Sequence, residues 1–140
     1  GIVFQDFRLL EDRTAEENVA FALEVTGVRK NLIQPKVMRV LTQVGLAAKA
    51  TAYPRELSGG EQQRVAVARA LINKPSVVLA DEPSGNLDSA SADRLHNLFF
   101  ELRERFGQTF VIVTHNEELA EMADRKLTMV DGRIVDENGD

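Results

Sequence analysis

Apolar residues along this chain gather in short runs that alternate with longer segments of mixed polarity. The short runs predict β-strands, and the fully apolar run at residues 77–80 is typical of a central strand in a parallel sheet. Asp131-Gly132 lies between two further apolar runs, which predicts a β-hairpin. We expect strands at residues 2–5, 77–80 and 109–114, and the hairpin within residues 126–137.

The ends of several helical segments are marked by their residue types. Thr14, with Glu17 three residues later, has the form of a capping box. Pro35 is expected in the first turn of the second helix. Strands that alternate with helices in the C-terminal half predict an α/β layered fold, whereas residues 14–55 are helical only and predict a separate subdomain. Helices are expected over residues 14–26, 32–44, 58–73, 89–106 and 117–123.

The composition is that of a globular domain: of 140 residues, 44% are hydrophobic and 28% are charged. The formal net charge of −5, without a basic run, gives no support to nucleic-acid binding. The chain has no cysteine, which excludes disulfides and thiolate metal sites. No apolar stretch approaches the roughly 20 residues that cross a bilayer, so a role in transport would require a different, membrane-spanning chain.

Ser58-Gly59-Gly60 stands at the start of the third predicted helix. Two glycines there let the backbone approach a ligand, and the free N–H groups at the positive end of a helix suit a phosphate. Taken alone, these three residues are explained better by an ordinary N-cap serine and a flexible turn.

Other candidates lie where predicted strands end. Asp81 and Glu82 follow the central strand, and such a pair taken alone is as often a solvated acidic turn as a functional site. His115 also follows a strand, where a lone histidine is more often structural or solvated than catalytic. Gln5 at the end of the first strand is uninformative by itself, and His96 in the middle of a helix is expected to be structural.

The wider sequence around these candidates resembles the ABC ATPase family over essentially the whole chain. Residues 57–64 read LSGGEQQR, which resembles the family's signature motif almost letter for letter. Residues 77–83, VVLADEP, look like a Walker B motif, and residues 84–88, SGNLD, look like the D-loop that follows it. His115 resembles the family's switch histidine, and Gln5 resembles the glutamine of its Q-loop.

The resemblance implies ATP and Mg²⁺ as cofactors and a role for each matched residue. Asp81 would hold Mg²⁺, usually through water, and Gln5 would help to bind the same ion. Glu82 would orient and polarise the attacking water and His115 would contact the γ-phosphate, which makes these two the implied catalytic residues. The implied nucleotide-binding residues are Gln5, Ser58, Gly59, Gly60, Glu61 and Asp88.

The implied fold is α/β: part of the P-loop NTPase fold of ABC ATPases, with a mainly parallel sheet and an α-helical subdomain. Residues 1–13 would form the Q-loop strand and loop, residues 14–57 the helical subdomain, and residues 58–140 the signature helix and the C-terminal α/β part. The implied partners are a transmembrane subunit, contacted by residues 7–14, and a second copy of the chain in a nucleotide-bound dimer. The implied location is peripheral, on the cytoplasmic face of the cell membrane.

Within the family, residues 4–27 and the SGNLD form of the D-loop resemble the branch of cell-division (FtsE-type), lipoprotein-releasing and macrolide-exporting ATPases, and we favour the cell-division type. One alternative is a non-hydrolysing ABC-like regulatory or binding module, which the intact Glu82 and His115 disfavour. Another is a repair-type or translation-type ABC ATPase that acts on DNA or ribosomes. The acidic balance and the absence of a coiled-coil insertion disfavour this second alternative.

One part of the family pattern does not occur in these 140 residues, the phosphate-binding G-x-x-x-x-G-K-[ST] loop. Its backbone amides and lysine hold the β- and γ-phosphates, and in the family it precedes the Q-loop, together with several strands. We therefore expect a C-terminal part of the subunit that binds ATP weakly or not at all when isolated. We also expect apolar faces at residues 77–79 and 110–113 to be uncovered, which favours self-association.

Overall fold

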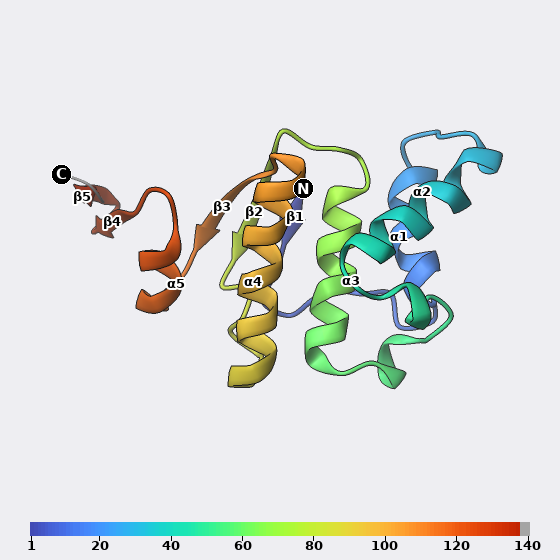
Figure 1. Ribbon diagram of the computed structural model, residues 1–140, viewed down its shortest axis with the longest axis horizontal. Coiled ribbons are helices and arrows are strands. Elements are labelled where there is room, and N and C mark those ends of the chain that lie inside the picture. The colour runs from blue at the N-terminus through green and yellow to red at the C-terminus, as the bar shows by residue number, and fades with distance from the viewer. Residues whose placement is uncertain (138–140) are drawn as a thin grey trace.

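Three parallel strands form the central sheet of the computed structural model, which describes residues 1–137 (Figure 1). Their order is β1 (Ile2–Val3), β2 (Val77–Asp81) and β3 (Thr109–Val113), so that β2 is the middle strand. In the parallel register Asp81 lies opposite Val113, which brings the carboxyl ends of β2 and β3 to the same edge of the sheet. The expected parallel sheet with a central strand at residues 77–80 is confirmed, although β1 ends two residues earlier than predicted.

Two helices, α3 (Gly59–Leu71) and α4 (Ser89–Phe106), pack against one face of this sheet. Val78 and Ala80 of β2 point into this interface and are almost completely buried. Phe110 lies opposite Val78 in the neighbouring strand, and the centroid of its ring is 4.9 Å from that of Phe99. The sheet therefore has a well-packed face toward α3 and α4.

The opposite face of the sheet is apolar and exposed within the described part of the chain. Its side chains are between 40% and 61% accessible, and they are those of Ile2, Val77, Leu79, Val111 and Val113. The expectation of uncovered apolar positions is thus confirmed for alternate residues. It is wrong for Val78, Phe110 and Ile112, which pack against the core because successive side chains in a strand point to opposite faces.

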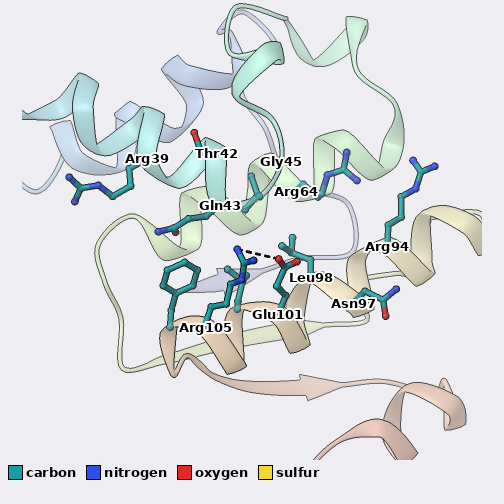
Figure 2. A pocket seen from close by; sticks show the side chains of 13 residues that line it. Arg39, Thr42, Gln43, Gly45, Arg64, Arg94, Asn97, Leu98, Glu101 and Arg105 are labelled. Atoms are coloured by element: carbon teal, nitrogen blue, oxygen red, sulfur yellow. Dashed lines mark ion pairs between the residues drawn. The ribbon is translucent and has the colours of Figure 1, made fainter.

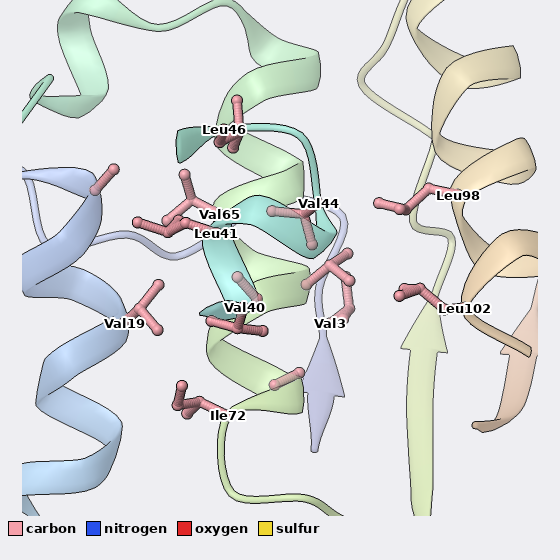
Figure 3. Close-up of a cluster of buried hydrophobic side chains, with 14 of the residues drawn as sticks. Val3, Val19, Val40, Leu41, Val44, Leu46, Val65, Ile72, Leu98 and Leu102 are labelled. Atoms are coloured by element: carbon pink, nitrogen blue, oxygen red, sulfur yellow. The ribbon is translucent and has the colours of Figure 1, made fainter. Parts of the chain in front are cut away.

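The segment between β1 and α3 contains only helical elements, as the sequence predicts. These are α1 (Ala15–Glu24), α2 (Lys30–Gln43) and two short 3₁₀ turns at Ala47–Lys49 and Pro54–Glu56. Figure 3 shows that side chains of α1 and α2 lie in the same apolar cluster as side chains of α3 and the sheet, among them Val19, Leu41 and Val65. The division of the chain into three parts stays a prediction.

Local signals set the ends of these helices with one exception. The capping box of α1 is present: Glu17 N donates to Thr14 Oγ1 at 3.3 Å, and Thr14 N donates to Glu17 Oε1 at 2.9 Å. Pro35 does not lie in the first turn of α2, because that helix already begins at Lys30. The missing proline N–H leaves the carbonyl of Asn31 without its helical donor, and Asn31 is exposed to solvent, which makes this position tolerable.

The C-terminal elements lie at the opposite end of the molecule from α1 and α2 (Figure 1). They are α5 (Glu117–Met122) and an antiparallel hairpin of β4 (Leu127–Val130) and β5 (Arg133–Glu137). Asp131 and Gly132 both have positive φ angles, 51° and 77°, as a two-residue hairpin turn of type I′ requires. No helix within residues 1–137 combines the length and the apolar character that crossing a membrane requires.

Candidate functional site

The carboxyl ends of β2 and β3 bring the two predicted catalytic residues together. His115 N donates to Glu82 Oε1 at 2.5 Å, and His115 Nε2 lies 3.7 Å from the same oxygen. Thr114 Oγ1 donates to the other carboxylate oxygen of Glu82 at 3.5 Å. A carboxylate and an imidazole therefore share one edge of the sheet, although 32 residues separate them in the sequence.

The backbone of Glu82 is held in an unusual conformation. Its φ angle is 44°, in the left-handed region that costs a residue with a side chain on the order of 1 kcal/mol or more. The N–H of Glu82 donates to Val113 O at 2.7 Å, which extends the pairing of β2 with β3 by one residue. This conformation turns the carboxylate toward His115. The Glu82 side chain is 22% exposed, and the His115 side chain is 99% exposed. Both groups can reach a ligand at the sheet edge.

Gln5 lies against the loop that follows β2. Gln5 Nε2 donates to Asn86 Oδ1 at 3.2 Å, and Asn86 Nδ2 donates back to the backbone oxygen of Gln5 at 3.1 Å. Gly85 makes room for this arrangement, because a Cβ atom at that position would lie 2.6 Å from Gln5 Nε2. The predicted Q-loop glutamine is thus fixed to the predicted D-loop, and its amide is bound to Asn86.

Gln63 connects α3 to the segments that follow β1 and β2, and it was not among the predicted site residues. Its side chain is fully buried, and its Nε2 donates to Phe4 O at 2.8 Å and to Pro83 O at 2.6 Å. Phe4 precedes Gln5 and Pro83 follows Glu82, so one amide group holds the backbone on both sides of the site. A glutamine on the buried face of an amphipathic helix was the available signal for this role.

Arg69 supports the turn that follows Gln5 and was also missed. Phe7 and Arg8 both have positive φ angles, 63° and 55°, and this irregular backbone leaves their carbonyl groups outside regular pairing. Arg69 Nη1 donates to Arg8 O at 2.7 Å, and Arg69 Nη2 donates to Phe7 O at 2.8 Å. Burial lowers the pKa of Arg69 from its ordinary value. Nothing local to residue 69 in the sequence indicates this contact.

The predicted signature motif forms a capped helix start. Glu61 N donates to Ser58 Oγ at 3.1 Å, and Ser58 N donates to Glu61 Oε1 at 2.9 Å. These bonds, chiefly the one from the Ser58 backbone, lower the pKa of Glu61. Both side chains are therefore engaged in the cap. The first-turn N–H groups of Gly59 and Gly60 have no partner within the helix, and of these two residues Gly60 is buried while Gly59 is half-buried.

Asp88 and His96 serve the geometry around the helix α4. Asp88 Oδ1 accepts a hydrogen bond from Ser91 N at 2.8 Å and caps the helix, and this bond lowers the pKa of Asp88. His96 is buried, lies 2.9 Å from Ser84 Oγ through its Nε2, and has a pKa lowered by burial. Asp88, at the end of the predicted D-loop, is thus engaged in a helix cap. His96 has the buried position that is expected of a structural residue.

The residues present fit an ion that keeps most of its water. Within residues 1–137 no three His, Cys, Asp or Glu side chains gather into a preformed metal cage. Mg²⁺ in phosphate-transfer sites usually takes one or two carboxylates, several waters and the substrate's phosphate oxygens, so it needs no such cage. Asp81 is exposed at the end of β2, where a carboxylate can serve in this way.

Comparison with known proteins gives a consistent set of similarities. A family model described as ABC transporter matches residues 1–85. The chain is 56% identical to the lipoprotein-releasing system ATP-binding protein LolD of Bacteroides fragilis over 96% of its own length and 62% of that protein. It is 50% identical to LolD of Porphyromonas gingivalis over 98% of its length and 63% of that protein. The chain therefore spans less than two thirds of these relatives.

Two solved structures resemble this chain closely. One is the dimeric post-hydrolysis state of the ATP-binding cassette MJ0796 bound to ADP and Pi, with 37% identity and a TM-score of 0.81. The match covers 98% of this chain and 61% of the solved chain. The other is cbiO1 from Clostridium perfringens, part of the ABC transporter complex cbiONQ, with 28% identity and a TM-score of 0.90. Here 98% of this chain covers 55% of the solved chain.

Proposed function

We propose an ATPase function for the protein that contains this chain. The chain belongs to the ABC transporter family, as the match to residues 1–85 shows. The resemblance inferred from the motifs is thereby confirmed, and so is the α/β fold class, because its structural neighbours are ATP-binding cassettes. The proposal is that the protein containing this chain is the ATP-binding and ATP-hydrolysing subunit of a lipoprotein-releasing ABC transporter. The names of the relatives support this choice.

The observation that carries the proposal is the pairing of Glu82 with His115 at the sheet edge. Glu82 would accept a hydrogen bond from the attacking water and orient it toward the γ-phosphate of ATP. His115, whose ring is fully exposed, would donate to a γ-phosphate oxygen. Asp81 and Gln5 would hold Mg²⁺, which supplies positive charge to the phosphate oxygens when it is bound. Gln5 would bind the ion through its Oε1, while its Nε2 donates to Asn86 and holds the amide in place.

The signature residues would act on ATP held by a second copy of the protein. Ser58, Gly59 and Gly60 present the positive end of α3, where N–H groups can donate to phosphate oxygens. Glu61 and Asp88 would belong to the same nucleotide site through the helix caps that they form. The dimeric state named for the MJ0796 cassette supports a homodimer as the nucleotide-bound form.

The remaining partner would be a transmembrane subunit, contacted by residues 7–14 from the cytoplasmic face of the membrane. The relatives' names, which refer to a lipoprotein-releasing system, support such a partner. The same names do not support the preference for the cell-division type, which stays unconfirmed. The isolated 140-residue chain would bind ATP weakly or not at all, because its sequence contains no G-x-x-x-x-G-K-[ST] loop to hold the phosphates.

The test is steady-state turnover of Mg-ATP by the full-length protein that includes this chain. We expect Glu82→Gln to reduce turnover at least about 100-fold, the scale of a lost general base. Glu101→Gln, the same chemical change on an exposed face of α4, serves as the matched control and should leave turnover unchanged. ATP binding without turnover in the unsubstituted protein would instead support the non-hydrolysing module.

A further inference from the structure

A cleft lined by arginines lies between α2, α3 and α4, away from the site described above (Figure 2). Its volume is about 900 Å³, and we call it the basic cleft. Four arginines and one acid line it: Arg39, Arg64, Arg94, Arg105 and Glu101. This concentration of positive charge is unexpected in a chain whose formal net charge is −5. The residues that line the cleft do not include Asp81, Glu82, His115 or the Ser58-Gly59-Gly60 segment.

Arg64 and Arg94 occupy one end of the basic cleft (Figure 2). Glu61 attracts Arg64 and Asp88 attracts Arg94, but neither acid forms a close ion pair with its arginine. In the described part of the chain no carboxylate lies within ion-pair distance of either guanidinium. The Nε atom of Arg64 is buried and has no hydrogen-bond partner. Burial lowers the pKa of Arg64, Glu61 opposes this shift, and the positive charge of Arg94 adds to it to a smaller extent. Two cations brought together with an unsatisfied buried donor are a costly arrangement unless an anion joins them.

The other charged residues of the cleft are less suited to this role. Arg105 pairs with Glu101 at 3.6 Å, with both side chains largely exposed, and such a surface pair contributes little. Figure 2 places Arg39 at the far end from Arg64 and Arg94. Leu98 and Leu102 also line the cleft and are almost fully buried. Among the described residues, Arg64 and Arg94 are therefore the two arginines without an ion pair that lie at the same end of the cleft.

We propose that Arg64 and Arg94 form a binding site for a phosphate group, separate from the ATP-hydrolysis site. A guanidinium presents its N–H groups in a planar fork that matches two oxygens of one anion. A terminal phosphate has three oxygens and about two negative charges, so it can accept from two forks at once, whereas a carboxylate has only two oxygens. The phosphate could belong to a soluble polyphosphate or to a lipid headgroup, since the chemistry recognised is the same.

A second cleft of about 410 Å³ continues the basic surface and shares Arg39, Gln43, Leu102 and Phe106 with the first. It adds Lys36 and Lys74, and no acid is among its lining residues. A ligand that extends past the Glu101–Arg105 pair would therefore meet further positive charge in this direction. This continuation favours a ligand with several phosphates over a single inorganic phosphate.

The test measures binding of pyrophosphate to the full-length protein by isothermal titration at low salt, with its ATP sites filled by a non-hydrolysable ATP analogue. Because the readout is binding, it does not depend on the proposed ATPase activity. We expect Arg64→Gln and Arg94→Gln each to weaken pyrophosphate binding at least tenfold. Arg94 is exposed, so its substitution tests the site even if loss of the half-buried Arg64 disturbs folding, which circular dichroism would reveal.

Arg29→Gln is the matched control, because Arg29 is an exposed arginine at the start of α2 that does not line either cleft. It should leave pyrophosphate binding unchanged, and an equal loss in this variant would overturn the proposal by showing general charge attraction. A second arm uses vesicles that contain phosphatidic acid, compared with neutral vesicles. Binding to these vesicles alone, lost in Arg94→Gln, would assign the site to a lipid headgroup. Binding to neither probe would overturn the proposal.

Discussion

Single buried polar groups fix the loops of the candidate site, and Gln63 is the clearest example. We predict that Gln63→Leu lowers the free energy of unfolding by about 2–4 kcal/mol, because the carbonyl groups of Phe4 and Pro83 lose their buried donor. Gln62→Leu is the matched control one residue earlier, where the half-buried side chain makes a single bond at 3.3 Å to Leu57 O. It should cost less than about 1 kcal/mol. Urea unfolding of both variants measures the difference.

Gly85 illustrates a residue whose lack of a side chain positions another group. We predict that Gly85→Ala lowers Mg-ATP turnover of the full-length protein about tenfold, because the new Cβ displaces the amide of Gln5 from Asn86. The melting temperature should change little, since Gly85 is exposed and its backbone is not in the left-handed region. Asn86→Ala removes the same hydrogen bonds without added bulk and should act in the same direction. Unchanged turnover in both variants would refute a positioning role for this contact.

The sequence indicates candidate residues for this site but not the residues that support them. Glu82 and His115 are candidates because each belongs to a short string of residues, and the structure places them side by side, while their catalytic role stays a prediction. Gln63 and Arg69 were missed because their partners lie 20 to 62 residues away along the chain and are backbone carbonyls, which carry no residue identity. The positive φ of Glu82 likewise has no local residue signal, since glutamate rarely adopts it.

At the scale of elements, helix starts were predictable and one helix interior was not. The Thr14–Glu17 box forms as predicted, because capping depends on residues three positions apart. The start of α2 was misplaced by two residues, since proline is tolerated inside this helix where solvent reaches the freed carbonyl. The three strands were found by their apolar runs, but only the alternation of burial shows which face of each is covered.

The two capped helix starts of α1 and α3 allow stability and activity to be separated. We predict that Thr14→Ala and Ser58→Ala each lower the free energy of unfolding by about 1 kcal/mol, because each removes an equivalent N-cap acceptor. Only Ser58→Ala should lower ATP turnover of the full-length protein by more than its effect on stability explains, because α3 is the proposed phosphate-facing helix. Equal turnover in the two variants would contradict that role.

The capping carboxylate of α3 should also contribute to the pH dependence of stability. Hydrogen bonding to Ser58 lowers the pKa of Glu61 below its ordinary value of 4.5. Its contribution is therefore present above that value and is lost as the pH falls through the lower pKa of the folded state. We predict that Glu61→Gln, which can still form a capping box, is slightly less stable than the unsubstituted protein at pH 7 and loses less stability between about pH 5 and pH 3, so that the difference shrinks in acid. Urea unfolding at several pH values compares how steeply the free energy of unfolding falls with pH in the unsubstituted protein and in Glu61→Gln.

At the scale of the whole molecule, the sheet is covered on one face only within the described residues. The apolar run at residues 77–80 indicated a strand buried on both faces, as central strands of parallel sheets usually are. Val78 and Ala80 are buried, whereas Val77 and Leu79 are exposed. A contiguous exposed apolar face above about a few hundred Å² usually marks an interface with further protein. The relatives, of which this chain spans about 62%, are long enough to provide it.

This exposed face should make the 140-residue chain associate with itself when it is studied alone. We predict that Leu79→Gln shifts the chain toward the monomer in sedimentation velocity, because Leu79 lies at the centre of the face and is 48% exposed. Leu32→Gln is the matched control, since Leu32 is similarly exposed, at 44%, but lies on α2 away from the sheet. It should leave the association unchanged. An equal shift in both variants would mean that association follows general surface hydrophobicity, and a monomeric unsubstituted chain would mean that the sheet face does not drive association.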